Sequence, residues 1–167
     1  LVLASTGIGA APQQPSARAR ASEQTALDRY VAAPDPNFAW KPVRDLQAPE
    51  GVKATLLEMT SQKWLTEQEV ERPQWTHWLT VIRPASVTSD IGLLFITGGS
   101  LERPAPTQPP AWLVDAAKTT GTVTAELRLV PNQPVVFKDD PEHKPRTEDG
   151  FIAYTWNKYL RTGDEKW

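Results

Sequence analysis

The chain has 167 residues, enough for one domain with a sizeable core, since a chain of about 150 residues buries roughly 70% of its unfolded surface. Its 18 basic and 20 acidic side chains nearly cancel, so no strong field favours nucleic acid or an anionic membrane as a partner. The absence of cysteine excludes disulfides, thiolate metal sites, iron–sulfur clusters and cysteine nucleophiles.

The beginning of the chain differs in composition from the rest. Residues 1–11 are apolar and small, and polar, irregular sequence follows to Arg20. This pattern is typical of the back half of a secretory signal peptide, or of an unstructured chain end. We favour the signal peptide, so residues 1–20 are assigned to its remnant and the protein is expected to be periplasmic or secreted. No later apolar run approaches the ~18 residues of a membrane span.

A linker is predicted next, over residues 21–50. Residues 21–30 can form a short helix, which Pro34 and Pro36 would end. Residues 38–49 are expected to cross the surface in extended form. The main domain is predicted to run from 51 to 167.

The main domain begins with a sheet-like pattern. Residues 53–64 are rich in β-formers, and residues 75–82 combine aromatic and β-branched side chains. The polar residues between them, 66–72, make an antiparallel hairpin plausible. Residues 91–97 form an apolar run without polar alternation, which is typical of a strand that helices cover on both faces.

The remaining elements alternate between helix and strand. Residues 109–118 predict a helix that Gly121 ends, and residues 123–130 predict another strand. Residues 147–161 predict a helix with a Thr147 cap, acids in its first turn, bases in its last and Gly163 at its end. One face of that helix is apolar and carries Ile152, Trp156, Tyr159 and Leu160.

This order of elements predicts an α/β protein. An antiparallel hairpin followed by a β-α-β unit with parallel strands is how α/β-hydrolase sheets begin. In that architecture the loop after the third strand supplies backbone N–H groups to an oxyanion hole, and glycine permits close approach. Gly98, Gly99 and Ser100 are therefore candidate oxyanion-hole donors. The alternative is a turn in which glycine only supplies a positive φ.

Three short motifs carry a family resemblance. The segments Pro131-Asn-Gln-Pro134, Arg146-Thr-Glu-Asp149 and Ile152-Ala-Tyr-Thr-Trp-Asn-Lys158 resemble the PhoPQ-activated pathogenicity-related proteins, from about Leu27 to Trp167. The resemblance implies a secreted or periplasmic protein of the α/β-hydrolase superfamily. Its members are much longer and carry a Gly-x-Ser-Lys-Arg-Gly nucleophile elbow beyond the helix that ends near Gly163.

The resemblance therefore implies that this chain is an amino-terminal fragment with an incomplete hydrolase fold. The serine precedes the acid and the histidine in such a triad, so no catalytic residue of it is expected within this chain. We expect the fragment alone to be inactive, and to expose an apolar sheet edge. Replacing Gly99 with valine in the full-length protein is expected to reduce turnover while largely sparing the fold.

Other chemistry within the chain is less favoured. Ser100 lacks the second glycine of a Gly-x-Ser-x-Gly elbow, and a proline-rich loop separates it from the next helix. His77, between tryptophans, is interpreted as a structural histidine. Residues 138–145 contain His143 and several carboxylates, but their alternating charges favour a solvated loop over a metal site. No metal or cofactor is predicted.

Asn132 and Gln133 are candidate substrate-binding residues. They follow a strand end on the edge where ligands bind in open α/β sheets, if the sheet is parallel there. An Asn-centred turn explains them equally well. The tryptophans Trp75, Trp78 and Trp112 are assigned to packing.

Two function classes remain for the whole protein. One is a serine hydrolase that acts on acyl or peptide bonds of a small-molecule or peptide substrate. The other is a non-catalytic extracellular binding or signalling protein on a hydrolase scaffold.

Overall fold

The computed structural model describes residues 24–167, which form two compact units divided between Pro34 and Asp35. The segment 1–20, assigned above to a signal remnant and its lead, lies outside the described residues. The first unit contains helix α1, Ala26–Ala32, which begins with a capping box. Thr25 accepts a hydrogen bond from the backbone N–H of Asp28, and the Asp28 carboxylate accepts one from the backbone N–H of Thr25.

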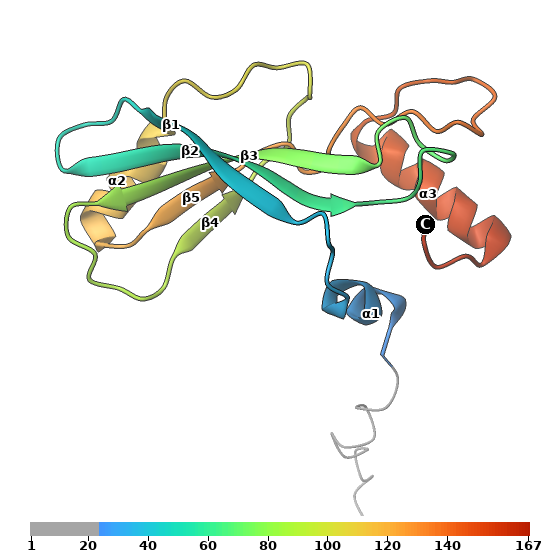
Figure 1. The fold of residues 1–167 in the computed structure, drawn as a ribbon, viewed down its shortest axis with the longest axis horizontal. Coiled ribbons are helices and arrows are strands. Elements are labelled where there is room, and N and C mark those ends of the chain that lie inside the picture. Colours follow the sequence, from blue (N-terminus) through green and yellow to red (C-terminus); the bar gives the residue numbers. More distant parts are fainter. Residues whose placement is uncertain (1–23) are drawn as a thin grey trace, which may run out of the picture. The chain divides into compact units, whose positions relative to one another are not determined.

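The second unit contains a five-stranded sheet in the order β1-β2-β3-β5-β4 (Figure 1). The strands are β1 Ala39–Leu46, β2 Val52–Lys63, β3 Gln74–Pro84, β4 Leu93–Ile96 and β5 Thr124–Leu127. The β2–β3 pair is antiparallel, as the hairpin pattern predicted, and β4 pairs with β5 in parallel. Strand β1 lies where an extended surface segment was expected, because it pairs with β2 along its length.

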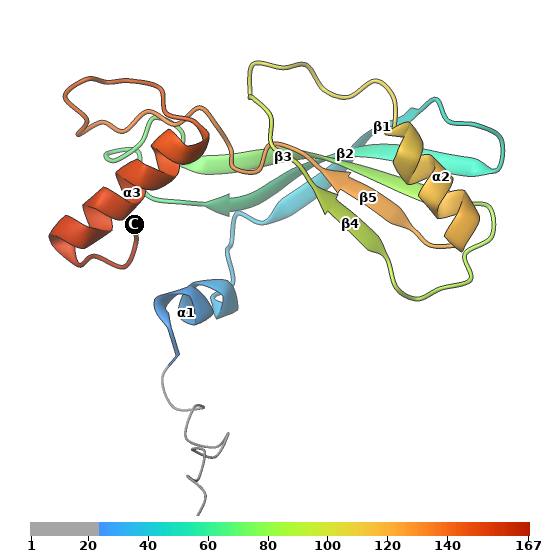
Figure 2. The same ribbon diagram turned by 180° about the vertical axis from the view of Figure 1, so that it is seen from behind.

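Helix α2, Ala111–Thr120, packs against β3 and β5 and is seen from the other side in Figure 2. Leu113, Val114 and Ala117 bury the face that meets the sheet. Gly121 ends the helix in the left-handed conformation, with φ of +64°, as predicted. The main core consists of this face and of side chains from three strands: Leu46, Ala54, Leu56 and Ile82.

The expected cover of strand β4 was wrong. Its apolar run predicted a strand covered by helices on both faces, but β4 is the edge strand of the described sheet. Its four side chains are between 41% and 56% exposed. The ring of Phe95 is covered in part by Trp112 of α2, at 4.8 Å between ring centres. An apolar run indicates that a strand needs other elements packed on its faces, but it does not show that the described residues supply them.

Helix α3, Glu148–Thr162, ends at Gly163 as predicted, but it buries a different face from the expected one. Phe151 and Thr155 are buried. The predicted apolar face is exposed, and its members are Ile152, Trp156, Tyr159 and Leu160. Thr147 occupies the N-cap position, but its side chain makes no capping hydrogen bond.

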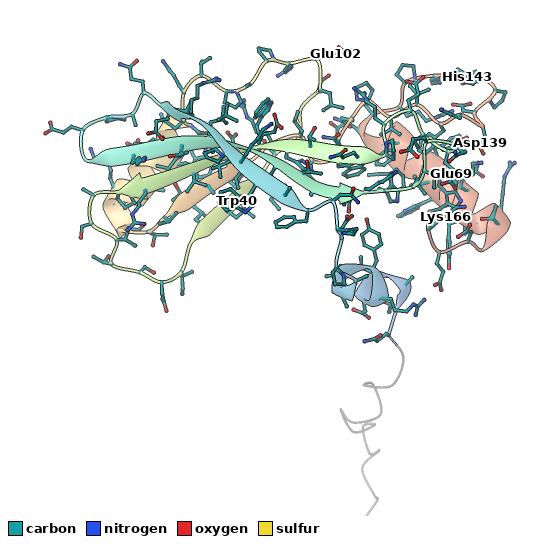
Figure 3. The ribbon with its side chains drawn as sticks, viewed as in Figure 1. Trp40, Glu69, Glu102, Asp139, His143 and Lys166 are labelled. Atoms are coloured by element: carbon teal, nitrogen blue, oxygen red, sulfur yellow. The ribbon has the colours of Figure 1, made fainter. Side chains whose placement is uncertain are left out.

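A second core, separate from the first, holds α3. It is built from Val70, Val135, Phe137 and Phe151, with Trp64, Trp75, Tyr154 and Trp167 at its margin. Trp64 makes edge contacts with several of these rings, including Phe151 at 5.5 Å. An ion pair at 2.7 Å between Glu69 and Lys166 closes the end of this region, where Figure 3 labels both residues.

Candidate functional site

The loop after β4 continues alongside the chain that follows β5. The N–H of Thr97 donates to the carbonyl of Leu127 at 2.8 Å, and the N–H of Leu129 donates to the carbonyl of Gly98 at 3.2 Å. The backbone carbonyls of Thr97 and Gly98 therefore both accept hydrogen bonds from the chain after β5, that of Thr97 from the N–H of Val130. Within the described residues, the backbone N–H groups of Gly98, Gly99 and Ser100 donate to no protein acceptor. These groups remain available to an external acceptor.

The backbone conformation at position 99 requires glycine. Its φ is +137°, and an added Cβ would lie 3.2 Å from Cδ2 of Leu129. A valine at this position would strain the backbone, so the expectation that Gly99→Val spares the fold is wrong. Gly98 differs, because a Cβ there would meet only ordinary contacts, the nearest at 3.7 Å to Oε1 of Glu148.

The Ser100 hydroxyl takes part in a local turn. Its Oγ accepts a hydrogen bond from the N–H of Glu102 at 3.2 Å, and the Ser100 carbonyl accepts one from the N–H of Arg103. Figure 3 shows Glu102 at the outer tip of this loop. Within the described part of the chain, no histidine hydrogen-bonds to Ser100. The structure thus gives this serine a turn-forming role.

Asn132 and Gln133 are both buried, 4% exposed. The Asn132 amide donates to the carbonyl of Thr76. The Gln133 amide donates to the carbonyl of Gly99 at 3.2 Å and to Oε1 of Glu148 at 2.6 Å. Both side chains reach across to other segments of the chain.

Gln133 connects the glycine loop to the start of α3. Its Oε1 accepts from the N–H of Glu148 at 2.8 Å, and its carbonyl accepts from the N–H of Leu101 at 3.0 Å. Sequence reasoning missed Glu148 as the partner. The signal available was the acidic first turn of α3, but nothing in the spacing joined that turn to Gln133.

The glycine loop forms one wall of a hollow of about 310 Å³. Trp78 and the ends of β4 and β5 form the remaining walls, and the lining includes Arg103, Pro104, Glu126, Arg128 and Leu129. A second hollow of about 180 Å³ shares Trp78, Arg103 and Leu129 with the first. The lining pairs an aromatic ring with charged side chains, as small-molecule sites commonly do.

Charge in the hollow comes from three side chains that sequence reasoning did not single out. The Glu126 carboxylate is buried and pairs with Nε of Arg128 at 3.2 Å. Arg103 is exposed, and its guanidinium has no ion-pair partner among the described residues. The two arginines lie in a loop and beyond a strand end, where periodicity carries no information about which neighbours they meet.

His77 lies in β3 and is 3% exposed. Its Nδ1 lies 3.1 Å from the Arg128 carbonyl, which can only accept, so Nδ1 carries the proton. Its Nε2 then accepts from the hydroxyl of Ser61 at 2.8 Å. Burial lowers the pKa of His77 below its usual range, and the hydrogen bonds to the backbone offset this only in part. His77 is thus a neutral histidine held by both ring nitrogens.

The charged loop before α3 pairs its charges internally. Asp140 is buried and accepts two hydrogen bonds from Arg146, at 3.0 and 2.7 Å. Burial acts to raise the pKa of Asp140, but the Arg146 bonds and charge, together with hydrogen bonds from the backbone of Glu142 and Lys144, outweigh it, and the pKa lies below its ordinary value. His143 is exposed at the outer side of this loop (Figure 3). No group of three or more potential metal ligands gathers anywhere in residues 24–167.

These features define a mixed α/β protein with a hollow at the carboxyl ends of two parallel strands. The chain belongs to the PhoPQ-activated pathogenicity-related protein family, which it matches over residues 27–167. It is 32% identical over 145 residues to the Autocrine proliferation repressor protein A of Dictyostelium discoideum. That alignment covers 86% of this chain but 28% of that protein, so the chain spans little more than a quarter of its length. No solved structure matches the chain.

Among residues 24–167, no helix combines the length and the apolar character needed to cross a membrane.

Proposed function

We propose that this chain is the amino-terminal part of a periplasmic or secreted serine hydrolase that acts on acyl or peptide bonds. In this proposal Gly98, Gly99 and Ser100 donate oxyanion-hole N–H groups. The serine, the acid and the histidine of the triad lie in a part of the protein outside these 167 residues.

The sheet supports the hydrolase assignment. Strands β2, β3, β5 and β4 are adjacent in that order, and only the β4–β5 pair is parallel. The loops after β4 and β5 therefore leave the same edge, where ligands bind in open α/β sheets. The exposed apolar strand β4 and the 28% coverage of the relative support a larger protein.

The observation that carries the proposal is the set of unpartnered N–H groups in the wall of the hollow. A serine that attacks a carbonyl carbon leaves a negative oxygen on the tetrahedral intermediate, and a histidine takes the serine proton. Fixed N–H groups stabilise that oxygen without reorganising, and losing one such donor commonly costs about 100-fold or more in turnover. Gln133 holds the loop through the Gly99 carbonyl.

The test uses the full-length protein and a fluorophosphonate probe, which labels activated serines. We expect the label on a serine outside residues 1–167, with hydrolysis of a small ester. Gly99→Ala keeps the N–H group but strains the loop at its φ of +137°, so turnover should fall about 100-fold if the donor is displaced. Gly163→Ala, which alters a positive-φ glycine at the end of α3, is the matched control and should keep its turnover. A label on Ser100 would contradict the assignment of this residue as a donor.

A second candidate function is that of a non-catalytic extracellular signal on a hydrolase scaffold. The name of the relative, a proliferation repressor, supports it. A full-length protein that takes up no label and hydrolyses no ester would favour this candidate over the enzyme.

A further inference from the structure

We infer that the hollow beside the glycine loop recognises an anionic group, a carboxylate or a phosphate, on the molecule that the protein binds. The inference rests on the proposed function for its substrate, and it names the chemical class of that substrate. Four features of the described residues support it.

The first feature is charge balance. The charged residues that line the hollow are Arg103, Arg128 and Glu126. Glu126 neutralises one arginine, so one positive charge remains. The pair also fixes Arg128, because Glu126 is buried and engages Nε, which leaves the terminal nitrogens of Arg128 without a described partner.

The second feature is the position of Arg103. Arg103 lines both hollows, so this residue lies where they adjoin. The backbone places it there, since the N–H of Arg103 donates to the Ser100 carbonyl at 3.0 Å. Arg44 of β1 anchors the same loop through the carbonyl of Pro106, at 2.8 Å. An arginine on an anchored loop, without an internal ion pair, is suited to a ligand carboxylate or phosphate.

The third feature is the set of N–H groups described above. The backbone N–H groups of Gly98 to Ser100 are donors without acceptors in the same wall. They add hydrogen-bond donors to this wall, which favours a ligand that supplies oxygen atoms.

The fourth feature is Trp78, which lines both hollows and is half-buried. Its ring gives the site an apolar surface beside the charges. The inferred ligand is thus a small molecule or peptide segment with an apolar portion and an anionic group, and not a bare ion.

The experiment compares two esters on the full-length protein, 4-nitrophenyl acetate and the mono-4-nitrophenyl ester of succinate. In both, water adds across the acyl–oxygen bond to give a carboxylic acid and nitrophenol, and only the second ester carries an anionic acyl chain. We expect a kcat/KM ratio in favour of the succinate ester. Arg103→Gln should lower that ratio about 10-fold or more, as expected for a charged hydrogen bond.

Arg83→Gln is the matched control, because Arg83 is also an exposed arginine but does not line either hollow. It should keep the ratio. An unchanged ratio in Arg103→Gln would overturn the anion site while leaving the hydrolase proposal intact.

The anion site can also be tested if the protein proves not to be a hydrolase. If neither ester is hydrolysed, the hydrolase proposal fails, and calorimetric titration with 3-phenylpropanoate and with phenyl phosphate, each an anion with an apolar portion, decides the inference. Binding of either that weakens about 10-fold or more in Arg103→Gln supports the anion site. The preferred anion identifies the chemistry, and absence of binding to both overturns the inference.

Discussion

At the scale of single residues, burial decides what His77 can do. Its two ring nitrogens are engaged by Ser61 and by the Arg128 carbonyl, and the ring is 3% exposed. Adding a proton would place a charge in this site and would turn Nε2 from an acceptor into a donor. The folded protein therefore resists protonation of His77.

This resistance predicts a pH dependence of stability. The unfolded chain takes up the proton near pH 6.5, whereas the folded chain takes it up only at lower pH. The unfolded state thus binds more protons below about pH 6.5, and the free energy of unfolding should fall as the pH is lowered from 7.5 to 5.5. Urea unfolding at both pH values measures the difference.

Two variants check the assignment. His77→Gln should lower stability at pH 7.5 by about 1–3 kcal/mol and should flatten the pH dependence. His143→Asn is the control, because His143 is exposed and asparagine tolerates its φ of +45°. An equal drop with pH in His77→Gln and in the unaltered protein would assign the effect to other groups.

Gln133 gives a second prediction at this scale. Gln133→Leu removes three hydrogen bonds of a buried side chain, which join the half-buried Gly99 and the exposed Glu148. We expect a loss of about 2–4 kcal/mol in the free energy of unfolding. Gln68→Leu, at an exposed glutamine, should stay within about 0.5 kcal/mol. A small effect of Gln133→Leu would mean that the glycine loop holds its position without this side chain.

The sequence indicated part of the candidate site at this scale. Gly98 and Gly99 were singled out because a glycine pair after an apolar run predicts close backbone approach. The positive φ of Gly99 is the feature that the alternative, a glycine turn, predicted, and the oxyanion-hole role stays a prediction. Arg103 and Arg128 were missed, because isolated arginines in loops carry no periodicity. Which charges share a hollow depends on contacts between distant segments.

At the scale of elements, the sequence predicted the positions of helices and strands better than it predicted which elements pack against them. Helices α2 and α3 end at Gly121 and Gly163 as expected, because a residue in the left-handed conformation stops a helix and glycine adopts it readily. For β4 and α3 the expected covering was wrong. Hydrophobic periodicity identifies an apolar face without identifying its partner.

These two helix ends allow a matched comparison. Both glycines have similar φ, +64° and +68°, but a Cβ on Gly121 would overlap with Oγ1 of Thr88, whereas nothing lies within 4 Å of one on Gly163. Gly163→Ala should cost about 1 kcal/mol, from conformation alone. Gly121→Ala should cost more, because Thr88 must also move. Thermal unfolding of both variants measures the difference, and equal costs would show that Thr88 moves freely.

At the scale of the whole molecule, the edge strand β4 gives the described sheet an exposed apolar edge. The N–H groups of Leu93 and Thr97 donate toward β5, so the alternation of a parallel ladder directs those of Leu94 and Ile96 toward the open edge. Such an edge is a template for pairing with another strand.

We therefore expect the 167-residue chain by itself to associate through β4. Leu94→Lys should reduce this association severalfold, measured by light scattering and sedimentation velocity, because a charge on an edge strand opposes pairing. Leu160→Lys, which removes an exposed leucine from α3, is the control. An equal reduction by both variants would assign association to general surface hydrophobicity.

The separation of the two cores has a consequence for how the second unit opens. Strand β3 contributes Ile82 to the main core and Trp75 to the margin of the aromatic one, so it is a structural connection between them. Amide hydrogens of α3 depend on the aromatic core, whereas those of α2 depend on the main core. Native-state hydrogen exchange should therefore resolve two cooperative opening units, with β3 exchanging as slowly as the more stable of the two.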